Sequence, residues 1–180
     1  MNPQVLTVYK SPFNKIRLGK NNDGGYIVAD LIDANYKTLI SGGLGNDISF
    51  EEAFITKYPN VVAVLLDGTI NNLPRNFIKK NIDHENNLHD IINEKDKIFV
   101  KMDIEGGEIP WLNSLNNEQM NKFEQMVIEF HHPYYNSNIF EKINKSHYLI
   151  HFHGNNCCGV KNYEGVNIPH VFECTYVVNF

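Results

Sequence analysis

Six short apolar runs recur along the chain, and their spacing constrains the fold more than any other feature. The runs are rich in β-branched and aromatic residues, as strands buried on both faces are. Segments with helical spacing separate several of them. This alternation predicts an α/β fold, a mostly parallel sheet with helices on both faces. The expected strands are Tyr36–Gly43, Val61–Asp67, Lys97–Asp103, Gln125–His132, Tyr148–Gly154 and Val171–Phe180, and the expected helices are Ile48–Tyr58, Leu88–Glu94, Ile109–Phe123 and Ile139–Lys145.

Two connections are less regular than the rest. Asn155–Pro169 contains no helical pattern, so the last strand is expected to enter the sheet antiparallel. Between Gly68 and Lys97, only Arg75–Ile82 reads as a further short strand. With 180 residues, 42% of them hydrophobic, the chain is expected to form one domain.

Composition excludes several classes of partner. The net charge is -5 and the lysines are scattered, which argues against nucleic acid or anionic lipid. No apolar stretch approaches the ~20 residues of a membrane span, and the N-terminus lacks a signal-peptide pattern, so a cytoplasmic protein with a small, soluble partner is expected. Cys157, Cys158 and Cys174 are an odd set without metal-type spacing, which predicts reduced thiols rather than a disulfide framework.

A glycine-rich turn follows the first expected strand. Gly42, Gly43 and Gly45 would let a ligand approach the backbone closely at the start of a helix. The next strand ends in Asp67, which could accept hydrogen bonds from the two hydroxyls of a ribose. Together these features predict a nucleoside-bearing cofactor across the carboxyl ends of the strands; a tight turn without a ligand is the alternative.

The turn does not match a dinucleotide site. Gly43-Leu44-Gly45 is followed by Asn46, Asp47 and Ile48, so the third glycine of the usual G-x-G-x-x-G pattern is absent. A nearby acid would also repel a pyrophosphate, whereas it would suit the cationic sulfonium and ammonium groups of S-adenosylmethionine. The sequence therefore favours methyl transfer over an oxidoreductase that uses NAD or a nucleotide sugar.

Two acids follow the strand Lys97–Asp103. Asp103 and Glu105 would lie on the same side if the strand continued, so both could converge on one site at the sheet edge. Gly106 and Gly107 would leave room for a ligand. The alternative is that Glu105 and Glu108 are helix N-terminal acids that the helix dipole stabilises by ~0.3 to 1 kcal/mol each, and this alternative is favoured for Glu108.

Histidines end the next two strands. His131 and His132 end one strand, and His151 and His153 alternate along the next, so His153 could meet His131 or His132 at one sheet edge, where a histidine could act as a general base. Asp103, Glu129, His131 and His153 are also the right residue types for a divalent metal site, and such a metal, Mg²⁺ for example, could acidify a sugar hydroxyl. Imidazoles satisfied by the backbone are the third alternative.

Five motifs in order resemble those of the FkbM-type methyltransferase family: RLGKNNDGGYIV, SGGLGNDISFEEAF, VKMDIEGGE, VIEFHH and HFHGNN. The resemblance covers about residue 17 to the C-terminus. It implies a Rossmann-like class I methyltransferase fold that binds S-adenosylmethionine, and hydroxyl acceptors that are often sugars or polyketides. It also implies one domain, 1–180, with an N-terminal cap or flap at 1–35 and the Rossmann-like core at 36–180.

The resemblance assigns roles to individual residues. Gly42, Gly43 and Gly45 would line the methionine end of the cofactor, Asp67 would hold the ribose, and Asp103 would sit beside the methyl group. The Asn22–Gly25 turn, a hairpin or loop from its composition, would be a flap that brings Asp23, Gly24 and Tyr26 near the ligand. The stretch from Asp67 to Ile98 is shorter than the family pattern, and Asp83 or His84 would have to supply the adenine contact.

The sequence thus predicts an S-adenosylmethionine-dependent O-methyltransferase that acts on a hydroxyl of a sugar or glycoconjugate precursor. Its catalytic residues would be Asp103, His131 and His153, and its cofactor-binding residues Asp23, Gly24, Gly42, Gly43, Gly45, Asp67, Asp83 and Asp103. A second copy of the chain could cover the site of so short a protein. The alternatives are the oxidoreductase and a non-catalytic, degenerate Rossmann-like binding module.

Overall fold

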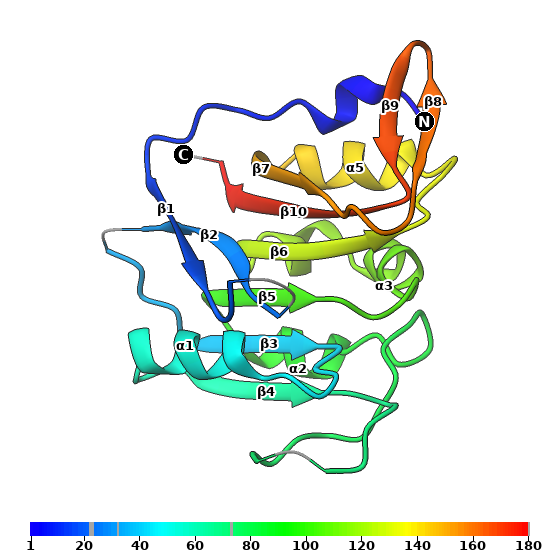
Figure 1. Ribbon diagram of the computed structural model, residues 1–180. Coiled ribbons are helices and arrows are strands. Elements are labelled where there is room, and N and C mark those ends of the chain that lie inside the picture. Colours follow the sequence, from blue (N-terminus) through cyan, green and yellow to red (C-terminus); the bar gives the residue numbers. More distant parts are fainter. Residues whose placement is uncertain (22–23, 32, 73, 180) are drawn as a thin grey trace.

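A six-stranded sheet forms the centre of the protein, whose computed structural model describes residues 1–21, 24–31, 33–72 and 74–179. The spatial order of the strands is β4-β3-β5-β6-β10-β7 (Figure 1). β3 to β6 are parallel, and β10 runs antiparallel to both β6 and β7. All six predicted strands are present, and the antiparallel last strand is confirmed; their bounds are β3 Thr38–Gly42, β4 Val62–Leu66, β5 Ile98–Met102, β6 Phe123–His131, β7 His147–Gly154 and β10 Val171–Val178.

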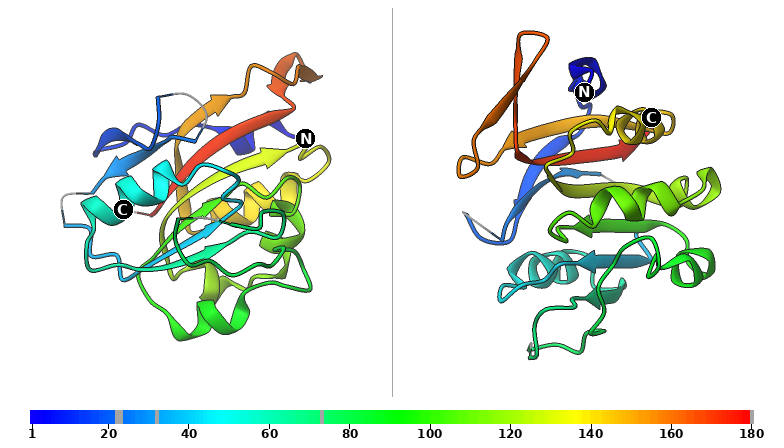
Figure 2. Two further views of the ribbon diagram at one scale, coloured as in Figure 1. Left: turned by 60° about the horizontal axis from the view of Figure 1, so that its bottom comes forward. Right: turned by 90° about the vertical axis from the view of Figure 1, so that its right-hand side faces the viewer.

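Different elements cover the two faces of the sheet (Figures 1 and 2). Helix α1 (Ser49–Lys57) and the hairpin of β1 (Asn14–Leu18) and β2 (Tyr26–Asp30) bury one apolar cluster against one face. On the other face, η1 (Pro3–Leu6), α2 (His89–Glu94), α3 (Glu108–Ser114), α4 (Asn117–Met120) and α5 (Ser137–Asn144) bury a larger one. None of the described helices is long and apolar enough to cross a bilayer.

The predicted helix Ile109–Phe123 is wrong as a single element. It is divided into α3 and α4 because Leu115 is extended and Asn116 starts a new helix. The Asn116 side chain accepts from the Gln119 N–H, and the Gln119 side chain accepts from the Asn116 N–H, which is a capping box. Phe123 belongs to β6, where it is fully buried.

Two further predictions need correction. Arg75–Ile82 is not a strand: its only pairing among the described residues is one parallel bridge between Ile78 and Leu66. The segment Asn155–Pro169, expected to be a loop, contains a hairpin of β8 (Val160–Tyr163) and β9 (Val166–Pro169). Its turn includes Gly165 at a φ of +85°, a conformation that glycine adopts without strain.

The cysteines also differ from the prediction. Cys157 and Cys158 are joined in a disulfide, so the prediction of reduced thiols is wrong for this pair. Spacing arguments consider cysteines that close a loop of several residues, whereas a bond between neighbours closes only the small ring that contains their shared peptide bond and leaves no such pattern. Cys174 is a free thiol, buried in β10, and burial raises its pKa.

Candidate active site

A cleft of about 900 Å³ lies at the carboxyl ends of β3 to β6. This is the edge at which open α/β sheets bind ligands, and the volume suits a nucleoside-sized cofactor together with an acceptor. Among its described lining residues are seven carboxylates and three Lys or Arg side chains. The acids are Asp47, Glu51, Asp67, Asp103, Glu105, Glu129 and Glu173, and the bases are Arg17, Lys80 and Lys101. This excess of acids favours a cationic ligand.

The glycine turn forms one wall of the cleft. A Cβ on Gly43, which has a φ of +73°, would lie 1.5 Å from the Asp103 carbonyl oxygen, so the turn and the end of β5 approach too closely for any side chain. Gly45 has a φ of +55°, and a Cβ there would meet nothing within 4 Å. Gly42 does not line the cleft; a Cβ on it would meet Ile82 and Met102, so its role is packing beneath the turn.

Asp67 holds the glycine turn in place. Its Oδ2 accepts from the N–H groups of Leu44 and Gly45 at 2.9 and 3.0 Å. Its Oδ1 accepts from the Thr69 N–H and hydroxyl and from the Ile70 N–H. Burial alone would raise the pKa of Asp67, but these hydrogen bonds lower it overall. A ribose would have to share oxygens that already accept five hydrogen bonds.

Behind the turn lies a buried acid that sequence reasoning missed. Glu51 of α1 is 1% exposed; its Oε1 accepts from the Ser41 hydroxyl at 2.5 Å, and its Oε2 has no partner among the described residues. A buried carboxylate oxygen without a partner is costly, which points to a ligand cation. The only available signal was an acid at the first turn of the helix after the glycines.

Asp103 lies at the junction of the turn, β5 and the N-terminal hairpin. Its Oδ2 accepts from the Tyr26 hydroxyl at 2.8 Å and lies 4.0 Å from the Lys101 ammonium. Lys101 is 4% exposed and donates to the carbonyl oxygens of Gly42 and Gly43. Burial and the nearby Asp103 raise the pKa of Tyr26, so the phenol keeps its proton and donates it. The Asp103 Oδ1 is turned toward His131.

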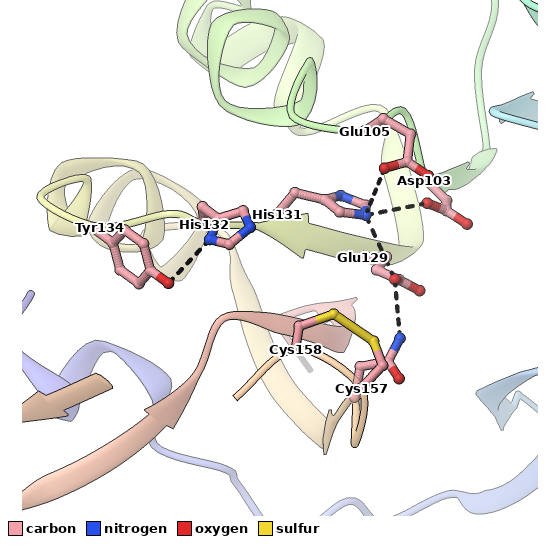
Figure 3. The surroundings of a disulfide bond; sticks show 9 residues. Asp103, Glu105, Glu129, His131, His132, Tyr134, Cys157 and Cys158 are labelled. Carbon is pink, nitrogen blue, oxygen red and sulfur yellow. Dashed lines mark hydrogen bonds and ion pairs between the residues drawn. A yellow bond between two sulfur atoms is a disulfide. The ribbon is translucent and has the colours of Figure 1, made fainter. Parts of the chain in front are cut away.

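His131 is surrounded by carboxylates (Figure 3). Its Nε2 lies 3.5 Å from Glu105 Oε2, 3.6 Å from Glu129 Oε1 and 3.9 Å from Asp103 Oδ1. Asp103 and Glu105 therefore converge as predicted, although β5 ends at Met102 and a turn with Glu105 at a φ of +55° directs the second acid. Burial alone would lower the pKa of His131, but the hydrogen bond to Glu108 and the surrounding carboxylates raise it to about 9.

Glu108 has a larger role than the favoured alternative gave it. It begins α3 and accepts from the N–H groups of Ile104 and Gly106, as a helix N-terminal acid does. It is also 0% exposed, and its Oε1 lies 3.0 Å from His131 Nδ1. With this hydrogen bond Glu108 sets the orientation of the ring and directs Nε2 into the cleft.

His153 lines the cleft but lies outside the cluster around His131. Among the described residues, the donor atoms that gather within 4.8 Å of one another belong to Asp103, Glu129 and His131. His153 is exposed and pairs across the sheet with Glu173, which in turn pairs with Glu129. The predicted four-residue metal set is thus reduced to three residues.

Of the remaining predicted contacts, Gly24 lines the cleft and Asp83 does not. Gly24 lines the cleft with Arg17 and Tyr26, and β1 and β2 form the predicted hairpin; Asp23 lies outside the described residues. Asp83 does not line the cleft, and its carboxylate accepts from the Glu85 and Asn86 N–H groups. Asn81 and Ile82 line that side instead.

The sequence model of the methyltransferase FkbM domain matches residues 2–156, most of the chain. The chain belongs to this family. No sequence among curated proteins matches it. Membership confirms the resemblance inferred from the five motifs, and it supports methyl transfer as the general activity of this domain. The six-stranded α/β sheet is consistent with a methyltransferase-like fold.

Proposed function

We propose that this FkbM-family protein is an S-adenosylmethionine-dependent O-methyltransferase with a Rossmann-like core, and that its acceptor is a hydroxyl of a sugar or glycoconjugate precursor. The observation that carries the proposal is the contact of the glycine turn with Asp103, which joins the expected cofactor wall to the acid cluster of β5 and β6. Family membership supports methyl transfer.

The residues of the cleft fit this cofactor. The surplus of carboxylates complements a ligand with a sulfonium and an ammonium group. The Oε2 of Glu51, which has no partner within the described part of the chain, offers a site for a cation. The open side of Gly45 leaves room for a ligand against the backbone. Gly43, Gly45 and Gly24 would bind the cofactor, and Asp67 would shape its wall, with any ribose contact sharing its oxygens.

The chain's own residues would position the acceptor and remove its proton. When bound, S-adenosylmethionine supplies a methyl group on a cationic sulfur, which leaves with the bonding electron pair as the acceptor oxygen takes the methyl. Asp103 and His131 would align the acceptor hydroxyl, and a carboxylate of the cluster would receive its proton. His153, exposed at the rim, would contact the acceptor. A sugar, with several hydroxyls, suits a polar cleft of this kind.

Calorimetric titration with S-adenosylhomocysteine tests the proposal, and NAD⁺ serves as the control ligand. Binding of S-adenosylhomocysteine alone, with one site per chain, is the expected result. Binding of NAD⁺ in its place would favour the oxidoreductase, because a pyrophosphate would then have entered the acidic cleft. Binding of neither ligand would contradict the proposal and favour a degenerate binding module. Transfer of a radiolabelled methyl group to a panel of free sugars and nucleotide sugars then identifies the acceptor.

A further inference from the structure

We propose that Asp103, Glu129 and His131 form a binding site for a divalent cation of the Mn²⁺ type, at the end of the cleft that would hold the acceptor. The site itself rests on the geometry of these side chains. The role assigned to the ion below rests on the proposed methyl transfer.

The donor atoms are spaced slightly wider than the ligands of one ion. Metal–ligand bonds of about 2.1 Å separate two neighbouring ligands by about 3.0 Å at the 90° angle of an octahedral site and by about 3.4 Å at the tetrahedral angle. Glu129 Oε1 and Asp103 Oδ1 lie 3.6 and 3.9 Å from His131 Nε2. All three donors lie within 4.8 Å of one another, so small carboxylate rotations would close the set around an ion.

Each of the three ligands is oriented by an outer partner. His131 has its Nδ1 against the buried Glu108, so that Nε2 faces the cleft. Asp103 has its Oδ2 occupied by the Tyr26 hydroxyl, so that Oδ1 faces His131. The Asn155 amide donates to Glu129 Oε1 at 3.3 Å. Metal sites characteristically hold their ligands in this way, and a ligating imidazole commonly donates its other N–H to a carboxylate.

Charge around the imidazole also favours a cation. Asp103, Glu105 and Glu129 lie within 4.0 Å of His131 Nε2 (Figure 3), and Glu108 lies 3.0 Å from its Nδ1. The Lys101 ammonium lies 4.0 Å from one of these acids, Asp103, on the side away from His131. Two carboxylates and one imidazole suit Mn²⁺, which accepts both hard oxygen and nitrogen donors.

The ion would act on the acceptor. With three protein ligands it would keep open positions toward the cleft, where a hydroxyl could bind and lose its proton more readily. Glu105 lies 3.5 Å from His131 Nε2 with its side chain 86% exposed, so it would receive the proton and pass it to water. The oxygen–methyl bond then forms as the methyl–sulfur bond breaks, its electron pair stays on the sulfur, and the total charge is conserved.

Manganese titration followed by electron paramagnetic resonance tests the site. The chelator-treated protein is titrated with Mn²⁺, and the loss of the free-ion signal gives stoichiometry and affinity. One site per chain is expected, and Glu129→Gln should weaken it at least tenfold. The matched control is Glu173→Gln, which removes one charge from the same cleft at the position paired with Glu129 across the sheet and should change the affinity less than threefold. Equal losses in the two variants, or no binding at millimolar Mn²⁺, would overturn the proposal.

A second readout locates the ion. Bound Mn²⁺ should broaden the ring resonances of His131, assigned through His131→Gln, more strongly than those of His147, which is buried at the start of β7. Glu108→Gln, which retains an acceptor oxygen, should weaken Mn²⁺ binding by about 10- to 100-fold. Broadening that spares His131 would contradict the site. Mn²⁺ binding without S-adenosylhomocysteine binding would uphold the metal site while contradicting the proposed function, and the reverse result would do the opposite.

Discussion

Replacement of Gly45 by alanine tests whether the open side of the glycine turn is a ligand wall. Gly45 has a φ of +55°, and an added Cβ would meet nothing within 4 Å, so the methyl group would project into the cleft that this residue lines. Gly165, in the β8–β9 turn, provides a matched control. Its φ is +85°, a Cβ there would also meet nothing within 4 Å, and it does not line the cleft.

Both substitutions should destabilise the protein to a similar extent. An alanine in the left-handed region costs about 1–2 kcal/mol relative to glycine. For a chain of this size, each kcal/mol lowers the midpoint of thermal unfolding by roughly 2–4 °C. Only Gly45→Ala should also weaken S-adenosylhomocysteine binding. An extra methyl in a packed contact costs about 1–3 kcal/mol, which corresponds to a loss of affinity of roughly 5- to 150-fold.

Thermal unfolding of the free proteins and calorimetric titration with S-adenosylhomocysteine measure the two effects separately. Unchanged affinity in Gly45→Ala, with wild-type binding intact, would refute the assignment of this wall to the cofactor. A much larger loss of stability in Gly45→Ala than in Gly165→Ala would show that the turn is closely packed on its open side, which would refute the geometric reasoning.

Two other substitutions test the surroundings of the cleft, and a third test concerns a buried histidine away from it. Glu51→Gln should raise the free energy of unfolding of the free protein by about 1 kcal/mol, because a neutral amide replaces a buried carboxylate whose Oε2 has no partner among the described residues. Urea unfolding measures this, and a loss of stability would contradict it. Asp67→Asn should lower the free energy of unfolding by about 2 kcal/mol in the same assay, because an amide nitrogen cannot accept the hydrogen bonds that the Leu44 and Gly45 N–H groups donate to the carboxylate. Unchanged stability would mean that other contacts hold the turn. Burial lowers the pKa of His147 to about 4, against 6.5 ordinarily. Between these pH values the imidazole stays neutral in the folded protein, whereas in the unfolded chain it binds a proton. The free energy of unfolding should therefore fall as the pH drops from about 6.5 to 4, and this group should contribute a loss of about 2 kcal/mol at pH 5. His147→Gln should remove that part of the slope in urea unfolding at a series of pH values, and an unchanged slope would exclude His147 as its source.

The sheet could be predicted from the sequence because its strands are apolar on both faces. Runs such as Ile98–Met102 carry few polar residues to confuse the pattern, and all five residues of β5 are buried. The α3–α4 break could not be read from apolar spacing, because it depends on the mutual capping of Asn116 and Gln119. The β8–β9 hairpin was missed for another reason: β8 is largely exposed and lacks an apolar run.

Individual site residues were harder to predict than their location. Asp103 and His131 were found because both end strands, and strand ends of a parallel sheet meet at one edge. Glu51 and Glu108 were not assigned to the site, since each is an acid in the first turn of a helix, where the dipole already explains it. Only the tertiary structure turns Glu108 toward His131 and buries Glu51 against Ser41.

The acidic residues of the cleft restrict the charge of its ligand more strongly than any single sequence motif does. Two unit charges 4 Å apart interact by about 4 kcal/mol at an effective dielectric constant of 20. A pyrophosphate placed beside Asp103 and Glu105 would therefore be repelled, unless Lys101 were released from its contacts with Gly42 and Gly43; Asp47, which also lines the cleft, is already paired with Lys20. A cation would be attracted instead. The cleft thus discriminates by charge, and the two cations proposed for it, a methyl-bearing sulfonium and a divalent metal, would partly repel each other across Asp103. That repulsion is relieved when the sulfur leaves as a neutral thioether, so an ion at His131 would favour transfer of the methyl group over retention of the charged donor.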